Sequence, residues 1–110
     1  MDAQEQRRLL ELAAKAAGIG PVLCYESARN CLRIGNRESY TLWRPLTDDG
    51  DNRRLQVALE LELRVFNGKA HAGKQDQFWI TEDWFPDGDP NTASRLAVLR
   101  AAAVLGENMP

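Results

Sequence analysis

The sequence is poor in metal-binding and reactive side chains, with one histidine and two cysteines among 110 residues. One histidine and two cysteines seven residues apart form no usual zinc ligand set. We expect Cys24 and Cys31 to be buried, reduced thiols, which a tight hairpin between them would make cross-strand neighbours. The composition therefore predicts no cofactor and no metal.

The chain also lacks a long hydrophobic run and a large excess of either charge. No stretch is long enough to span a bilayer, and residues 1–8 are polar where a secretory signal would be apolar. Fourteen basic residues against sixteen acidic ones give a net charge of -2, which leaves no overall electrostatic footprint for nucleic acid. We expect a cytoplasmic protein with no membrane partner.

What the chain does have is the composition of an ordinary globular domain. Hydrophobic residues make up 44% and charged residues 27%. A chain of this length can form a core without disulfides or metals. We predict one domain over residues 1–110, with no internal repeat or linker.

Periodicity and capping signals divide the chain into helices and strands. Asp2 with Glu5 begins a helix that Gly18 ends, Thr47 or Asp48 precedes a second, and Asp89 caps a third. Alternating apolar residues predict strands between them. The expected order is α-β-β-(β)-α-β-β-α, with helices over residues 2–18, 52–61 and 89–106 and extended segments over 22–25, 32–34, 40–43, 61–65 and 77–82.

The first and third helices are both rich in alanine, which lets two helices approach closely. We place them side by side on one face of a mainly antiparallel sheet of about four strands, with the second helix on the other face. This arrangement is an α+β fold of the alpha/beta/alpha sandwich type. With both faces covered, Trp79 is expected in the core.

Two segments resemble a known family. They are residues 43–51 (Trp-Arg-Pro-Leu-Thr-Asp-Asp-Gly-Asp) with the helical run after them, and residues 89–106 (Asp-Pro-Asn-Thr-Ala-Ser-Arg-Leu-Ala-Val-Leu-Arg-Ala-Ala-Ala-Val-Leu-Gly). In them the chain is similar to the phage ABA sandwich domain, a family of small bacteriophage proteins. The resemblance implies an alpha/beta/alpha sandwich encoded by a phage or prophage, and hence the cytoplasm of a bacterial host. It implies no catalytic residue.

The residues that could carry chemistry have simpler structural interpretations. His71 lies between glycines and lysines in an expected hairpin loop, where no catalytic partner can be assigned to it. The carboxylates of residues 48–51 and 82–89 could hold a divalent ion if the fold joined them, but helix caps and solvated turns explain them better. We predict no catalytic residue and no enzyme.

The best candidate for a functional site is an interaction surface. Two large aromatics, Trp84 and Phe85, occupy a loop, and loops on a rigid scaffold often carry recognition. An equally good interpretation folds both rings back over the sheet edge. We add the nearby polar residues Lys69, His71 and Lys74 to this candidate surface.

Three classes of function follow from these observations. The first is a non-enzymatic phage accessory protein that binds a host or phage protein. The second is a nucleic-acid-associated protein that uses lysines and stacked aromatics. The third is an enzyme with an unrecognised site, and self-association through an edge strand is a separate possibility.

Overall fold

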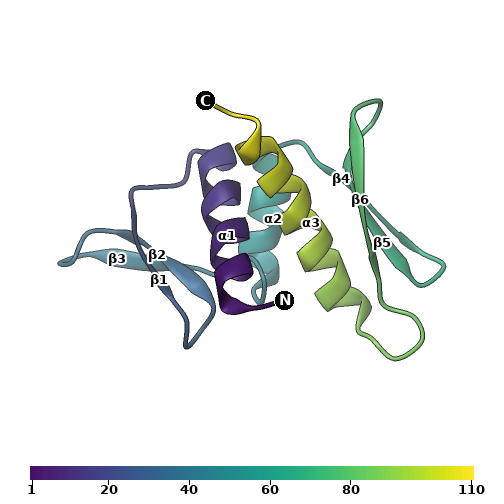
Figure 1. Ribbon diagram of the computed structural model, residues 1–110, viewed down its shortest axis with the longest axis horizontal. Helices are drawn as coiled ribbons and strands as arrows, with labels where there is room; N and C mark the ends of the chain where they lie inside the picture. The colour runs from purple at the N-terminus through teal and green to yellow at the C-terminus, as the bar shows by residue number, and fades with distance from the viewer.

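The computed structural model describes residues 1–110 and is an α+β fold of three helices and two antiparallel sheets (Figure 1). None of the helices is both long enough and apolar enough to cross a bilayer. The helices are α1 (Ala3–Ala17), α2 (Asp49–Ala58) and α3 (Pro90–Glu107), and the strands are β1 (Val22–Glu26), β2 (Cys31–Gly35), β3 (Tyr40–Trp43), β4 (Glu62–Phe66), β5 (Lys69–Lys74) and β6 (Phe78–Asp83).

The helices begin where aspartates cap them. The side chains of Asp2, Asp48 and Asp89 each accept a hydrogen bond from the backbone N–H three residues later, at 2.8–2.9 Å. Such caps satisfy a donor that has no partner within the helix. Gly18 ends α1 in the left-handed conformation, with φ of 68°, which glycine adopts without strain. The predicted caps are confirmed.

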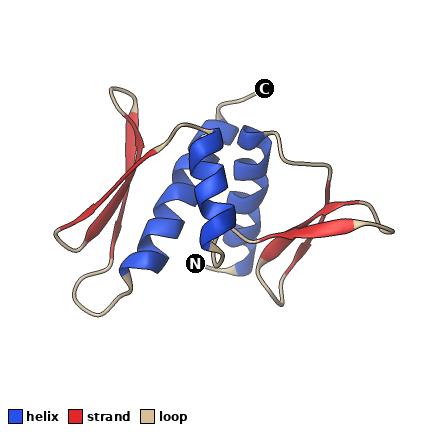
Figure 2. Cartoon of the chain, turned by 180° about the vertical axis from the view of Figure 1, so that it is seen from behind, coloured by secondary structure: helices blue, strands red, loops and turns tan.

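The layers differ from the predicted sandwich. Two three-stranded sheets, β1-β2-β3 and β4-β5-β6, replace the single sheet of about four strands. The three helices lie between the two sheets (Figures 1 and 2). Each sheet is a meander whose strands pair with their neighbours in the chain, because short turns favour antiparallel pairing. α2 interrupts the strand series and packs on α3 within the helical layer, not on the opposite face of a sheet.

The predicted pairing of α1 with α3 is confirmed and forms the centre of the core. Ala13 and Ala14 of α1 and Ala97 and Ala101 of α3 are fully buried. At Gly106 an added Cβ would lie only 2.0 Å from the carbonyl oxygen of Leu12. Small side chains therefore bring these two helices into direct contact, while α3 also packs on β5 and β6, and α1 packs on β2.

One polar side chain is buried among these elements. Asn52 of α2 is 6% exposed, and its amide donates to the carbonyl oxygens of Pro45 at 2.8 Å and of Arg95 at 3.0 Å. Both donors of the amide are thus satisfied, as burial requires. The two bonds tie α2 to the preceding loop and to α3.

Candidate functional site

The first two strands of the second sheet are joined by a two-residue turn, where the sequence interpretation placed a longer loop. Asn67 and Gly68 have φ of 52° and 74°, the pair of positive values that a type I′ turn requires. β5 therefore starts at Lys69, and His71 lies in the middle of this strand. The prediction of a loop for His71 is wrong. The signal was available, because Asn-Gly between alternating segments is the strongest local mark of a tight hairpin.

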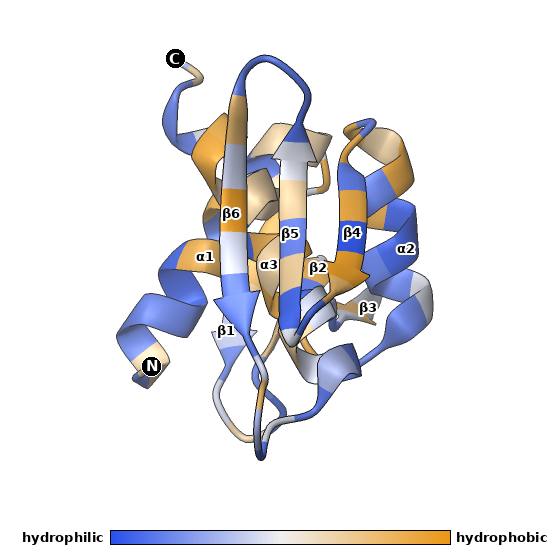
Figure 3. Cartoon of the chain, turned by 90° about the vertical axis from the view of Figure 1, so that its right-hand side faces the viewer, coloured by the Kyte–Doolittle hydropathy of each residue, from blue (hydrophilic) through white to orange (hydrophobic).

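Side chains alternate across this sheet between a face that packs on the helices and a face that is open. Ala70, Ala72 and Ile80 belong to the helix side, where they join or border the core. Figure 3 views the other side, with the helices behind it. Trp79 belongs to that side and is 38% exposed, so its predicted place in the core is wrong. The reason is that the helices cover only one face of each sheet.

The indole of Trp79 lies against an arginine on the outer face. Gly73, its register partner on β5, has no side chain and cannot have one, since a Cβ there would lie 2.1 Å from the carbonyl oxygen of Phe78. On the far side of Gly73, the Arg64 guanidinium carbon is 4.9 Å from the Trp79 ring centroid. A glycine in the central strand thus lets residues of the two flanking strands meet in a cation–π contact.

A second pair of rings extends the same face. The centroids of Phe66 and His71 are 5.2 Å apart, and His71 Nδ1 is 2.9 Å from Thr81 Oγ1. Phe66 is 52% exposed. At the hairpin end, Lys69 pairs with Asp83 at 2.6 Å. We call the outer side of this sheet the open face, with the residues Arg64, Phe66, Lys69, His71, Trp79 and Thr81.

The structure separates the five residues of the predicted interaction surface. Trp84 is half-buried against the core, with its indole N–H enclosed and unpartnered, whereas Phe85 is 74% exposed. Phe85 is therefore exposed, as the recognition interpretation expects, whereas Trp84 is folded back, as the alternative interpretation expects. Lys69 and His71 lie on the open face, and Phe85 adjoins its turn at Gly68. By strand alternation Lys74 belongs to the helix side, opposite Phe78.

Sequence reasoning also missed the residues at the centre of the face. Arg64 was placed on a strand without a role, Phe66 lay just beyond the predicted end of that strand at residue 65, and Trp79 was placed in the core. The alternation of Arg64 and Phe66 with Leu63 and Val65 was visible in the sequence. What could not be read there was which side of the sheet the helices would cover.

The outer face of the first sheet is more polar. Arg33 lies 4.9 Å from the centroid of the Tyr40 ring and 3.4 Å from Glu26. Glu26 also pairs with Arg29 at 2.7 Å, and chiefly the hydrogen bond from Arg29 holds the pKa of its carboxyl below the ordinary value. An ion-pair network therefore occupies this face.

The tight hairpin that would have made the two cysteines directly opposed neighbours does not form. Cys24 pairs with Arg33, and Cys31 pairs with Glu26. The turn at residues 27–30 is longer than the tight hairpin that would have placed the thiols opposite each other. Cys31 is fully buried, and this burial is the main reason that the pKa of its thiol is raised.

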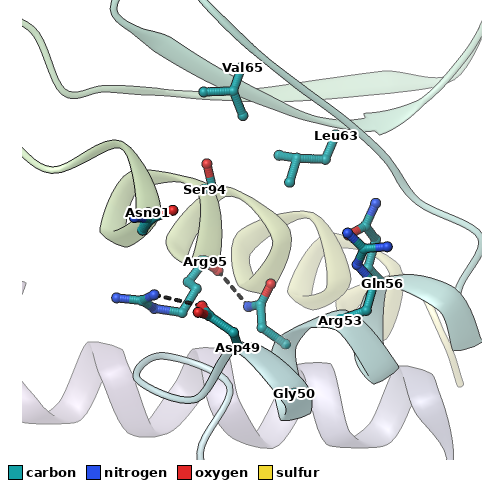
Figure 4. A pocket seen from close by; sticks show the side chains of 10 residues that line it. Asp49, Gly50, Arg53, Gln56, Leu63, Val65, Asn91, Ser94 and Arg95 are labelled. Atoms are coloured by element: carbon teal, nitrogen blue, oxygen red, sulfur yellow. Dashed lines mark hydrogen bonds and ion pairs between the residues drawn. The ribbon is translucent and has the colours of Figure 1, made fainter.

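A polar cleft of about 530 Å³ opens beneath β4, between that strand and the helices α2 and α3 (Figure 4). Leu63 and Val65 point into it from the strand. On its helix side Arg95 pairs with Asp49 at 2.7 Å, which joins α3 to the first turn of α2. Arg53 also lines the cleft but makes no hydrogen bond or ion pair.

The acidic residues that suggested a divalent ion serve other purposes. Asp48 and Asp89 cap helices, and Asp49 binds Arg95. No three histidine, cysteine, aspartate or glutamate side chains lie close enough together to hold a metal ion. The two acidic loops are not brought into one ligand set.

Comparison of the chain with family models, curated proteins and solved structures finds no match. The resemblance to the phage ABA sandwich domain stays a prediction from the sequence.

Proposed function

We propose that the chain is a small, non-enzymatic accessory protein that binds another protein through the open face. In this proposal it is encoded by a phage or prophage and acts in the cytoplasm of the bacterial host, where its partner is a host or phage protein. The phage origin is supported only by the resemblance of residues 43–51 and 89–106. The binding role is supported by the side chains of the open face.

The observation that carries the proposal is the cation–π pair of Arg64 and Trp79 on an uncovered sheet. Tryptophan and arginine, together with tyrosine, are the residue types most enriched among the side chains that dominate the energy of protein interfaces. Phe66, more than half exposed, extends the apolar part of the same face. Because β-sheet backbone holds these groups in place, little conformational freedom would be lost on binding.

Charge favours a protein partner over nucleic acid. Both cations of the open face form ion pairs with nearby carboxylates, Arg64 with Glu62 at 2.9 Å and Lys69 with Asp83. A surface that tracks a phosphate backbone would carry unpaired positive charge, and its affinity would fall steeply with salt. Single-stranded nucleic acid stacking on the aromatics is therefore the less favoured alternative.

The test is affinity capture from the native cell's lysate, with nuclease-treated and untreated arms. Trp79→Ala and Phe66→Ala are compared with Tyr40→Ala, which removes the equivalent aromatic of the first sheet's Arg33–Tyr40 pair. We expect one protein to be retained by the wild type and by Tyr40→Ala in both arms, and to be lost with the other two variants.

The captured protein is then purified and titrated against the same variants, with circular dichroism confirming that each variant is folded. Loss of about 2 kcal/mol or more of binding energy with Trp79→Ala is the expected size for a central interface tryptophan. Capture only where nucleic acid is intact would favour the second class of function. Equal loss with Tyr40→Ala would show that the open face is not the specific surface.

A further inference from the structure

Of the four edge strands, β4 is the one that has no bulge, no inward-facing charge and more than four residues. β1 has a bulge between Val22 and Cys24, and β3 is only four residues long. β6 turns Glu82 toward the helices, where its carboxylate lies 2.7 Å from Arg100. Bulges, short strands and inward charges all protect sheet edges. β4 pairs with β5 in unbroken register and turns only apolar side chains inward.

The backbone of β4 has hydrogen-bonding groups free at this edge. Phe66 and Lys69 flank the two-residue turn and so form a hydrogen-bonded pair, which makes Arg64 the next β4 residue bonded to β5. The N–H and C=O groups of Leu63 and Val65 consequently point away from β5. No other backbone or side-chain group of the protein binds them. They form a ladder that another strand can continue.

The space beside this edge suits the side chains of an added strand. In an antiparallel pair, opposed residues place their side chains on the same side of the sheet. Residues opposite Leu63 and Val65 would therefore enter the cleft of about 530 Å³ between β4 and the helices. Val65 is 45% exposed, so an apolar neighbour there would remove apolar surface from water.

The unpaired positive charge inside the cleft indicates which kind of side chain an added strand would carry there. Arg95 is neutralised by Asp49, but the guanidinium of Arg53 has no partner (Figure 4). A carboxylate on an added strand would supply one, as a charge-assisted hydrogen bond. Gln56 lies beside Arg53 on the wall of the cleft, whereas Asn91 and Ser94 line it on α3.

We propose that β4 accepts an extended segment of a partner protein as a fourth, antiparallel strand, with alternate apolar residues and one acidic residue directed into the cleft. This is recognition by β-strand addition, in which the main chain supplies affinity and the alternate side chains supply specificity. It uses the edge and the cleft, not the open face, and does not depend on the function proposed above. A second copy of the chain is the rival occupant.

The probe is the peptide acetyl-Thr-Val-Thr-Val-Thr-Glu-Thr-amide, in which Glu and both Val share the face directed into the cleft, and the antiparallel direction places Glu beyond Leu63, on the side of Arg53. It is titrated into uniformly ¹⁵N-labelled full-length protein and followed by amide shifts in heteronuclear spectra. We expect saturable binding with Kd at or below about 1 mM, and shifts centred on Leu63, Val65 and Arg53. Replacing Glu of the peptide by Lys is expected to weaken binding at least tenfold.

Backbone methylation tests the ladder without altering the protein. Methylating the amide nitrogens of both peptide Val residues removes the donors that face β4 and is expected to abolish binding. Methylating two Thr amides, which face outward, leaves those donors intact and is the matched control. In the protein, Arg53→Glu should reverse the preference so that the Lys peptide binds more tightly, while Trp79→Ala should leave binding of the Glu peptide unchanged.

Several results would overturn the inference. These are the absence of saturable shifts up to about 10 mM peptide, equal affinity for the Glu and Lys peptides, equal effects of the two methylation patterns, and shifts centred on the open face. Concentration-dependent broadening of Leu63 and Val65 without peptide would assign the edge to a second copy.

Discussion

Replacing Gly106 by alanine sets two effects of opposite sign against each other. Alanine is favoured over glycine inside a helix by up to about 1 kcal/mol, and less near a helix end. The new Cβ, however, would lie 2.0 Å from the carbonyl oxygen of Leu12, whereas ordinary contact begins at 3.4 Å. The backbone of α1 or α3 would have to move by about 1.4 Å within a close-packed core.

We expect the cost of the steric clash to exceed the gain in helix propensity. Overpacking a core costs about 1–3 kcal/mol, and the obstacle here is backbone, which has no alternative rotamer. We expect Gly106→Ala to lower the free energy of unfolding by about 1–2 kcal/mol after the gain in helix propensity is included. The measurement is urea denaturation followed by the far-ultraviolet circular dichroism of the helices.

Gly50 provides the matched control. A Cβ there would lie 3.1 Å from the end of the Arg54 side chain, which can move aside, and 3.3 Å from the Asp48 carboxylate, close to the limit of ordinary contact. The same substitution at the start of α2 should therefore be neutral or stabilising by up to about 1 kcal/mol. A Gly106→Ala protein as stable as the wild type would refute the close approach of α1 and α3.

Three further predictions concern polar groups. Asn52→Asp places a carboxylate against two carbonyl oxygens, so urea denaturation at neutral pH should show a loss of about 2–4 kcal/mol, and unchanged stability would contradict the two hydrogen bonds. Asp89→Ala should lower Tm at neutral pH. Hydrogen bonds from the side chain and backbone of Thr92 hold the pKa of Asp89 below its ordinary value. The Asp89 cap therefore contributes its full stability above the ordinary pKa of an aspartate, and this contribution is lost as the pH falls through the lowered pKa. The difference in Tm between the wild type and Asp89→Ala should consequently shrink in acid. In alkylation followed by peptide mapping, Cys24 should react first and buried Cys31 only on unfolding, and equal rates would show that Cys31 is accessible.

Local features of the fold could be predicted from the sequence because their causes are local. The caps at Asp2, Asp48 and Asp89 depend on residues three positions apart, and the close pairing of α1 with α3 follows from alanine content. The division of the strands into two sheets could not be predicted in this way. It depends on where α2 sits relative to α3, and the contacts that decide this, such as Asn52 to Arg95, join residues far apart in the chain.

The candidate site was only partly predictable for a related reason. Lys69, His71 and Phe85 were selected as loop residues, and the structure gathers them around one hairpin, although two of them lie in or at the end of a strand. Arg64 and Trp79 were missed because the contact between them depends on Gly73, whose missing side chain lets them meet across the central strand. Neighbours across a sheet are set by register, and the register became readable only once the Asn-Gly turn was placed.

The order of the layers determines which surfaces remain available to a partner. In an alpha/beta/alpha sandwich the helices would cover both faces of the sheet, and Trp79 would be buried. With the helices in the middle, each sheet keeps one face in contact with water. The outer face of the first sheet carries the ion pairs of Glu26 with Arg29 and Arg33 beside the exposed Tyr40, whereas the outer face of the second exposes two aromatic side chains, Phe66 and Trp79. This difference is why the proposed binding role is assigned to the second sheet and not to the first.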